Sequence, residues 1–392
     1  MRVASSVTRR WLMKRGAAAA CLSAIGPMSL GRYRWPVSPK QPYSARAVEL
    51  IANSTVIDML APFSLGTSPW LRDPDTFTPE LVEKFRSSGI NVFHIATGVG
   101  GAQDPVRDVT RFLGLWNGFI ATHTEFLMRV DSPADLEAVG ESGKIGVLLG
   151  VQNSNHFQYD LDDIDFFYSL GQRVSQLTYN ARNRIGNGST ERVDGGLSDY
   201  GVAVVKRMNE VGMAVDVSHC GDRTTLDAIE VSEQPVLITH SNARALNAGH
   251  PRLKTDEMIE AMAAKGGVMG ITGVRMFVRG KEPTTIEDVL DHFDYVARLV
   301  GVEHVGLGSD SDLDGYDDMD PEELERLRAA YKDSYGFRDK IDIEGVDHPK
   351  RVYDLTEGLI RRGYTDEEIG LILGGNFQRA LSQIWLARYS HH

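Results

Sequence analysis

Short apolar segments alternate with amphipathic segments along this chain from residue 50 onward. Eight apolar runs rich in β-branched residues are separated, in most cases, by stretches with the 3.6-residue period of a helix. The runs cover residues 55–60, 90–96, 145–151, 173–179, 213–219, 235–240, 267–272 and 304–310. Strands that alternate with helices pair in parallel, and eight such units are the number that closes a (β/α)8 barrel.

The intervening segments complete this prediction of an α/β fold. Helical periods cover residues 79–88, 108–130, 197–211, 224–231, 255–265 and 285–300, followed by an acidic helix at 321–335 and closing helices near 350–362 and 366–387. The alternative is an open doubly wound sheet, but the Gly-x-Gly-x-x-Gly turn expected after its first strand is missing. We therefore predict one (β/α)8 TIM barrel over residues 48–392, with extra C-terminal helices.

The first 48 residues differ in charge from the rest of the chain. They carry nine Lys and Arg side chains and no Asp or Glu. Residues 8–14, Thr-Arg-Arg-Trp-Leu-Met-Lys, precede a mildly apolar, alanine-rich run that ends near residue 30. This order is typical of a twin-arginine export signal, although a mitochondrial presequence, a disordered basic tail and a lipoprotein site at Cys21 are alternatives. The apolar run is too short and too rich in alanine for a stable membrane span.

We accordingly expect an export signal at residues 1–30 and a linker at 31–47, which contains three prolines. The expected partner is the twin-arginine export machinery, and the expected location is the periplasm or another exported compartment. A content of 42% apolar and 24% charged residues excludes general disorder, and the net charge of −12 argues against a nucleic-acid partner. With only two cysteines, Cys21 and Cys220, the chain has neither a disulfide framework nor a Cys-based zinc cluster.

Polar residues end several of the predicted strands, where barrel enzymes carry their chemistry. These residues are Gln152, Tyr179, His219, His240 and Asp310. Neighbouring strands lie about 4.8 Å apart, so His219 and His240 can converge on one metal ion. Asp310 could then accept a proton from a water molecule that the ion activates. The pattern predicts a metal-dependent or catalytic site.

Several longer motifs carry a family resemblance. They include Gly-Leu-Ser-Asp-Tyr-Gly at 196–201, the segment at 204–219 that ends in Asp-Val-Ser-His, Pro-Val-Leu-Ile-Thr-His-Ser-Asn at 235–242, His-Pro-Arg at 250–252, Val-Gly-Leu-Gly-Ser-Asp at 305–310 and Gly-Gly-Asn-Phe-Gln-Arg at 374–379. Over roughly residues 52–385 the chain resembles the renal or membrane dipeptidase family. The resemblance implies a (β/α)8 metallo-hydrolase with two zinc ions that cleaves dipeptides, including those with a D-residue at the second position, and it makes a homodimer possible.

The resemblance also implies roles for individual residues. His219 and His240 match ligands of the family's second zinc ion. Asp310 matches an aspartate beside the activated water, and Arg252 matches an arginine that binds the substrate's carboxylate. Tyr179 stands where the family has a histidine near the substrate. Cys220 follows His219 on the opposite face of the strand and is expected to be a buried structural thiol.

Three metal ligands of the family are replaced in this chain. The first strand should end in His-x-Asp, but Leu60 and Pro62 occupy these positions and cannot bind a metal. Gln152 stands where a glutamate should bridge the two ions, and a neutral amide is a poor zinc ligand. Asp58 lies deeper in the strand and is expected to be structural. We therefore predict one zinc or other divalent ion on His219 and His240, with Gln152 or water completing the ligands.

Two hypotheses about function follow. The first is an exported metallo-hydrolase that acts on a dipeptide or a similar small amide. The second is a dipeptidase-like protein without peptidase activity that serves the periplasmic maturation of a peptide metabolite, such as a siderophore. A purely structural or binding role is a third option, which does not explain a polar cluster at the strand ends.

Overall fold

A closed parallel barrel forms the centre of the protein. The computed structural model describes residues 43–65, 69–98, 103–157 and 160–388, and all of these except Tyr43 belong to the compact unit Ser44–His392. Eight strands form the closed ring, because β9 pairs with β1 and β2 pairs with β4. The strands are β1 (Ile57–Asp58), β2 (Val92–Thr97), β4 (Ile145–Val151), β5 (Gln172–Gln176), β6 (Ala214–Asp216), β7 (Leu237–Ser241), β8 (Val268–Ile271) and β9 (Val305–Leu307). The predicted (β/α)8 barrel is confirmed, whereas the predicted export signal lies outside the described residues.

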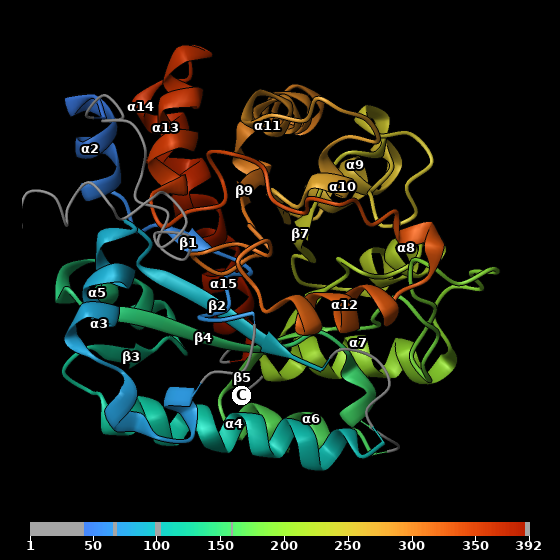
Figure 1. Cartoon of the computed structure of the whole chain (residues 1–392). Coiled ribbons are helices and arrows are strands. Elements are labelled where there is room, and N and C mark those ends of the chain that lie inside the picture. Colours follow the sequence, from blue (N-terminus) through green and yellow to red (C-terminus); the bar gives the residue numbers. More distant parts are fainter. Residues whose placement is uncertain (1–42, 66–68, 99–102, 158–159, 389–392) are drawn as a thin grey trace, which may run out of the picture. The chain divides into compact units, whose positions relative to one another are not determined.

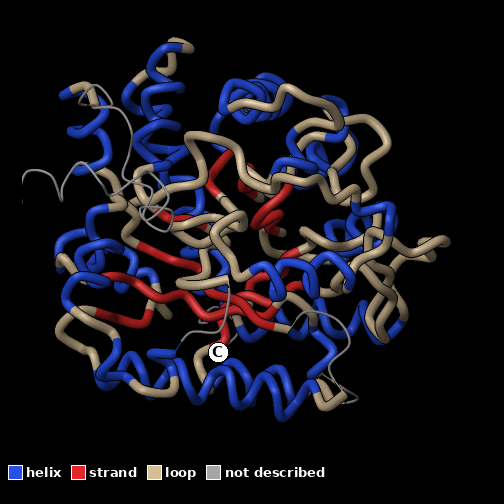
Figure 2. Tube along the Cα trace, in the orientation of Figure 1, coloured by secondary structure: helices blue, strands red, loops and turns tan. Residues whose placement is uncertain are grey.

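Helices surround the strands on the outside of the barrel (Figures 1 and 2). The α-helices of the described residues are α2 (Ala45–Ala52), α3 (Pro79–Ser87), α4 (Pro105–Thr122), α5 (Pro133–Ser142), α6 (Asp162–Ser169), α7 (Asp199–Val211), α8 (Asp222–Val231), α9 (Asp256–Ala264), α10 (Arg275–Val278), α11 (Ile286–Val300), α12 (Pro321–Ala329), α13 (Arg351–Arg361), α14 (Asp366–Gly370) and α15 (Asn376–Ala387). Side-chain caps start several of them: the hydroxyls of Ser132 and Thr255 accept hydrogen bonds from the backbone in the first turns of α5 and α9.

One predicted helix is wrong in its second half. The sequence predicts a helix over residues 108–130, but α4 ends at Thr122 and a ninth strand, β3 (Leu127–Arg129), follows. β3 pairs in parallel with the first half of β4, through Leu127 opposite Ile145. The apolar residues at 126–128 continue the helical period in the sequence, but pairing with β4 overrides that local preference.

The predicted closing helix at 366–387 is interrupted. A turn of π-helix at Leu371–Gly375 separates α14 from α15. A Cβ atom on Gly374 would lie 1.9 Å from the carbonyl oxygen of Thr55, so only glycine allows the chain to approach β1 so closely. α15 then covers one end of the barrel, where Phe377, Leu381 and Trp385 pack with residues of the strands.

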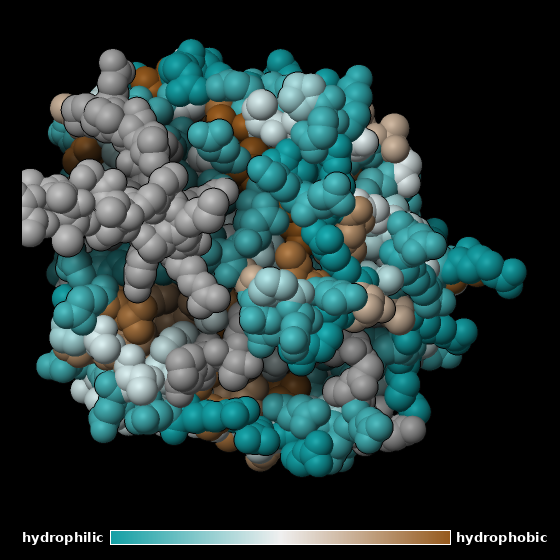
Figure 3. All heavy atoms as spheres, viewed as in Figure 1, coloured by the Kyte–Doolittle hydropathy of each residue, from teal (hydrophilic) through white to brown (hydrophobic). Residues whose placement is uncertain are grey.

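The surface is largely hydrophilic on the face drawn in Figure 3. Large apolar side chains that are exposed among the described residues are scattered in sequence: Val48, Phe166, Val193, Leu246 and Leu386. Within the described part of the chain, no helix combines the length and the apolar character that a membrane crossing requires.

Candidate functional site

The predicted site residues gather at the carboxyl ends of the barrel strands. His240 lies within β7, whereas β6 ends at Asp216 and β9 ends at Leu307. His219 and Asp310 therefore lie in the loops that follow their strands rather than in the strands themselves. Arg252 comes from the segment between β7 and α9. The site is thus built from the end of β7 and from several separate loops on one rim of the barrel.

His219 and His240 face each other across the ends of β6 and β7. Their Nε2 atoms lie 3.0 Å apart, and their ring centroids are separated by 5.1 Å. Both side chains are buried, with at most 1% exposure. Two imidazole nitrogens that bind one tetrahedral zinc ion at about 2.1 Å lie about 3.4 Å apart, close to the distance found here.

The outer nitrogens of both imidazoles are fixed by hydrogen bonds. His219 Nδ1 donates to Asn180 Oδ1 at 2.8 Å, and His240 Nδ1 lies 2.8 Å from the hydroxyl oxygen of Thr239. That hydroxyl donates its own hydrogen to Asp216 Oδ2, so its oxygen accepts from His240. Both Nδ1 atoms therefore carry the hydrogen, and both Nε2 atoms present lone pairs to the same point.

Two buried cations lie beside the histidine pair, and neither forms an ion pair with a carboxylate of the described residues. Arg252, fully buried, donates from Nη1 to the carbonyl of Ser218 and from Nη2 to that of His240 at 2.7 Å. Lys254 donates to the carbonyls of Val217 at 2.7 Å and Cys220 at 3.0 Å. Both cations thus fix the turn that carries His219, and Arg252 also connects it to β7.

The surroundings keep both histidines neutral. Burial, followed by the positive charge of Arg252, holds the pKa of His219 and that of His240 well below the usual range. Burial also lowers the pKa of Lys254 to about 8, which leaves it mostly charged at pH 7. A neutral imidazole is the form that binds a metal ion, so the protonation state suits a metal site.

Tyr179 forms an aromatic wall on one side of the pair. Its ring stacks on that of His219, with centroids 4.0 Å apart and planes inclined by 22°. Its hydroxyl lies 2.5 Å from the hydroxyl of Tyr331, which follows α12. Burial and the neighbouring tyrosines raise the pKa of Tyr179 well above its usual value, so the phenol stays protonated.

Asp310 stands on the loop after β9. Its backbone N–H donates to the carbonyl of Leu60 at 2.8 Å, and its φ angle is +57°. Burial raises the pKa of the Asp310 carboxyl to about 7, against the opposing effect of the Arg252 charge, while Asp58 and Asp216 raise it further. A carboxyl group with a pKa near neutrality can accept and release protons at physiological pH.

The ligand positions that differ from the family pattern do not provide a second metal site. Leu60 is 2% exposed and offers no donor atom, and Pro62 offers none from its side chain. Gln152 follows β4 and is half-buried, and its backbone carbonyl accepts a hydrogen bond from the Gln176 side chain. Across the described ranges, no group of three His, Cys, Asp or Glu side chains could hold a metal ion. His219 and His240 therefore offer two nitrogen ligands to an ion, and any further ligand must come from an amide, a backbone carbonyl or water.

Sequence reasoning missed several residues that support the pair. Asn180 orients His219, while Asp216 and Thr239 orient His240. Lys254 stabilises the turn that carries His219. All four lie within three residues of a predicted site residue, which is the signal that could have identified them. By contrast, Cys220 is buried and accepts a hydrogen bond from Thr178, in line with the expected structural thiol.

Comparisons with known proteins show which family and which structures this chain resembles. The family model of membrane dipeptidases (peptidase family M19) matches residues 82–331. An uncharacterized dipeptidase of Schizosaccharomyces pombe is 35% identical over 214 residues. The matched residues cover 53% of this chain and 51%, about half, of that protein. An amidohydrolase from Pseudomonas aeruginosa is 30% identical, with a TM-score of 0.73 over 86% of this chain and 99% of that one.

A second similar structure carries a ligand. It is a metallopeptidase from Rhodobacter sphaeroides bound to a phosphinate mimic of the dipeptide L-Ala-D-Ala. It is 19% identical, with a TM-score of 0.67 over 85% of this chain and 99% of that one. At this level of identity the likeness concerns the fold.

Proposed function

The chain belongs to the membrane dipeptidase family, whose members are metal-dependent hydrolases, and from this premise we propose that it hydrolyses a dipeptide or a similar small amide with one divalent ion. The observation that carries the proposal is the approach of two nitrogen atoms. The Nε2 atoms of His219 and His240 lie 3.0 Å apart, and each presents a lone pair to the other. Two such lone pairs repel each other unless a cation lies between them. Zinc is the ion that two buried neutral imidazoles suit best.

The proposed ion would supply Lewis acidity and would lower the pKa of water. Asp310 would accept the proton of the attacking water molecule and pass it to the leaving amine. The positive charge of Arg252 would stabilise an anionic substrate from behind the histidines, and direct contact with the substrate's carboxylate stays a prediction. Tyr179 would limit the space beside His219. Gln152 remains the proposed third ligand.

Metal analysis combined with a dipeptide panel tests this proposal. We expect the purified wild-type protein to hold about one ion per chain and to cleave at least one L,L or L,D dipeptide. The variants His219→Ala and His240→Ala should lose both properties, because each removes one of two ligands. His304→Ala is the matched control. This half-buried histidine lies directly before β9, its Nδ1 atom bonds to the carbonyl of Gly267, and its position in the chain is far from those of both ligands. Absence of both metal and cleavage in the wild type would contradict the proposal.

A second candidate function is favoured by the altered ligands. Leu60 and Pro62 replace two metal ligands of the family. The chain could therefore have lost peptidase activity and serve the maturation of an exported peptide metabolite such as a siderophore. In that case the dipeptide panel gives no cleavage, and a strain without this protein accumulates an unprocessed metabolite. Normal metabolite processing in that strain would argue against this candidate.

Export and assembly belong to the same proposal. The Arg9-Arg10 pair supports twin-arginine export to the periplasm. Replacing both arginines by lysine should retain the protein in the cytoplasm, which cell fractionation would reveal. A homodimer is proposed from the family resemblance alone, and the molar mass in solution tests it.

A further inference from the structure

Asp310 is held in an unusual backbone conformation. Its φ of +57° lies in the left-handed region, which a residue other than glycine occupies only at a cost. Such a conformation persists where the surroundings determine it, so the contacts of residues 309–312 show what holds Asp310. Two of them go to β1 and the residues just after it: Ser309 N donates to Asp58 Oδ1 at 2.9 Å, and Ser309 Oγ donates to the carbonyl of Leu60 at 3.1 Å.

The other contacts converge on Arg351, the first residue of α13. Its Nη2 group lies 2.9 Å from Ser309 Oγ and 3.1 Å from the carbonyl of Ser311, and its Nη1 group donates to the carbonyl of Asp312. The same Nη2 group forms an ion pair with Asp58 Oδ2 at 3.2 Å. One guanidinium thus contacts residues on both sides of Asp310.

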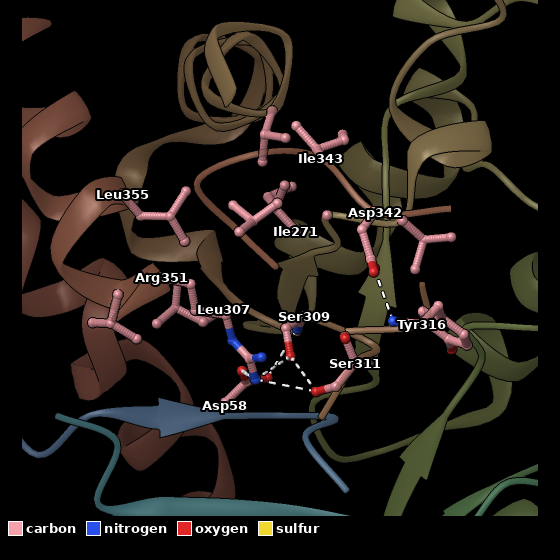
Figure 4. A pocket seen from close by; sticks show the side chains of 16 residues that line it. Asp58, Ile271, Leu307, Ser309, Ser311, Tyr316, Asp342, Ile343, Arg351 and Leu355 are labelled. Atoms are coloured by element: carbon pink, nitrogen blue, oxygen red, sulfur yellow. Dashed lines mark hydrogen bonds and ion pairs between the residues drawn. The ribbon is translucent and has the colours of Figure 1, made fainter. Parts of the chain in front are cut away.

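This ion pair is shielded from water. Arg351 and Asp58 are each 1% exposed. The cavity beside them measures about 20 Å³, which is room for about one water molecule, and apolar side chains such as Ile271, Leu307 and Leu355 line it. Figure 4 shows the guanidinium and the carboxylate pointing toward each other, with Ser309 and Ser311 beside them. In this apolar setting the contacts of Arg351 are stronger than they would be at the surface.

We propose that Arg351 is a positioning residue: through Ser309, Ser311 and Asp312 it holds Asp310 where the reaction needs a base. The inference rests on the proposed function, in which Asp310 accepts a proton. It also assigns a role to Asp58, which anchors the guanidinium on β1. The β1 end, where Leu60 and Pro62 provide no metal ligand, is thereby joined to the Asp310 loop by an ion pair.

The test is a double-mutant cycle on the metal-loaded protein, with the dipeptide that the wild type cleaves best as substrate. Arg351→Met should lower kcat about 100-fold, because a small displacement of Asp310 misaligns proton transfer. KM should stay within about twofold, since substrate contacts remain. In an Asp310→Asn background, Arg351→Met should cause no further loss, because its effect passes through Asp310. Additive losses, or a change in KM alone, would overturn the proposal.

Matched variants separate positioning from general damage. Arg362→Met removes a guanidinium that follows α13 and pairs with Asp291 and Asp294, and it should leave kcat unchanged. Arg351→Lys keeps the charge and should recover part of the lost kcat. If Arg351→Met fails to fold because Asp58 is left unpaired, the double variant Asp58→Asn/Arg351→Met takes its place.

Amide hydrogen exchange gives a readout that does not need activity. Arg351→Met should accelerate exchange at residues 309–312 while Arg362→Met does not. Unchanged exchange there would overturn the anchoring role. If the wild type cleaves no dipeptide, the proposed function fails, and the exchange result alone then decides whether Arg351 holds the loop.

Discussion

At the scale of single residues, the site is defined by which groups stay uncharged. His219 and His240 are neutral because they are buried next to Arg252, and their outer nitrogens are occupied by Asn180 and Thr239. The Asp310 carboxyl also resists ionisation, because burial raises its pKa to about 7. A bound cation would offset the free-energy cost of burying all three groups, since it attracts the lone pairs of the imidazoles and the negative charge of the carboxylate.

The raised pKa of Asp310 predicts the pH dependence of hydrolysis. Only the ionised carboxylate can accept a proton, so kcat/KM should rise about tenfold per pH unit below the pKa and level off above it. The pKa of about 7 holds without the ion, and a bound cation lowers it, so the limb should lie at or below pH 7. Asp310→Asn should remove the limb and lower the plateau by about 100-fold or more. A pH–rate profile of both proteins checks this, and an unchanged limb in the variant would contradict it.

At the scale of elements, the segment after α12 packs against the aromatic side of the site. Tyr331 bonds to Tyr179, which stacks on His219, and its ring stacks on Tyr335 at 4.5 Å. Lys332 donates to the carbonyl of Thr190 at 2.8 Å, so the segment is fastened to the loop after β5. The sequence indicated only an acidic helix here, because no local pattern reveals which loop a helix will cover.

Tyr331→Phe tests this fastening. Loss of the hydroxyl removes a hydrogen bond worth about 1 kcal/mol, so the segment spends more time away from Tyr179. We expect KM to rise about fivefold, because substrate binding must then order the segment. Tyr364→Phe is the control, since it also loses one hydrogen bond, to Asp294 at 3.0 Å, on the outer helices. Equal effects of both variants on KM would show that the segment does not control binding.

Local sequence patterns predict some elements of this fold and leave others hidden. The alternation of eight apolar runs with helical periods predicted the barrel, and the polar residues that end these runs predicted His219 and His240. Both signals lie within short stretches of the sequence. β3 and the break at Gly374 could not be predicted, because they depend on pairing with β4 and on the approach of Thr55. The role of Arg351 could not be predicted for the same reason: 293 residues separate it from Asp58, and only the closed barrel brings them together.

At the scale of the whole molecule, buried histidines dominate the response to acid. Among the described residues, burial lowers the pKa of six histidines: His94, His156, His219, His240, His250 and His292. Burial also raises the pKa of three carboxyls, Asp310, Asp312 and Asp342, which acts in the opposite direction. Because the histidines outnumber the carboxyls, the folded state should bind fewer protons than the unfolded state as the pH falls toward 4.

The free energy of unfolding should therefore decrease between pH 6.5 and pH 4. His292 illustrates the sign: its pKa is about 4 when folded, so between these values the unfolded chain binds a proton that the folded protein cannot. Its ring accepts from the backbone N–H of Ala243 at 3.2 Å and donates to the carbonyl of Val278 at 2.9 Å, which requires the neutral form.

His292→Gln, which can make similar bonds without titrating, should reduce the acid slope by up to about 1.4 kcal/mol per pH unit. Val296→Ala, a buried residue on the same helix α11, lowers stability through lost packing but removes no titratable group, so its slope should match that of the wild type. Denaturant unfolding from pH 4 to pH 8 measures all three slopes. Parallel slopes for His292→Gln and the wild type would mean that His292 is protonated in the folded protein, and that its bonds tolerate the charge.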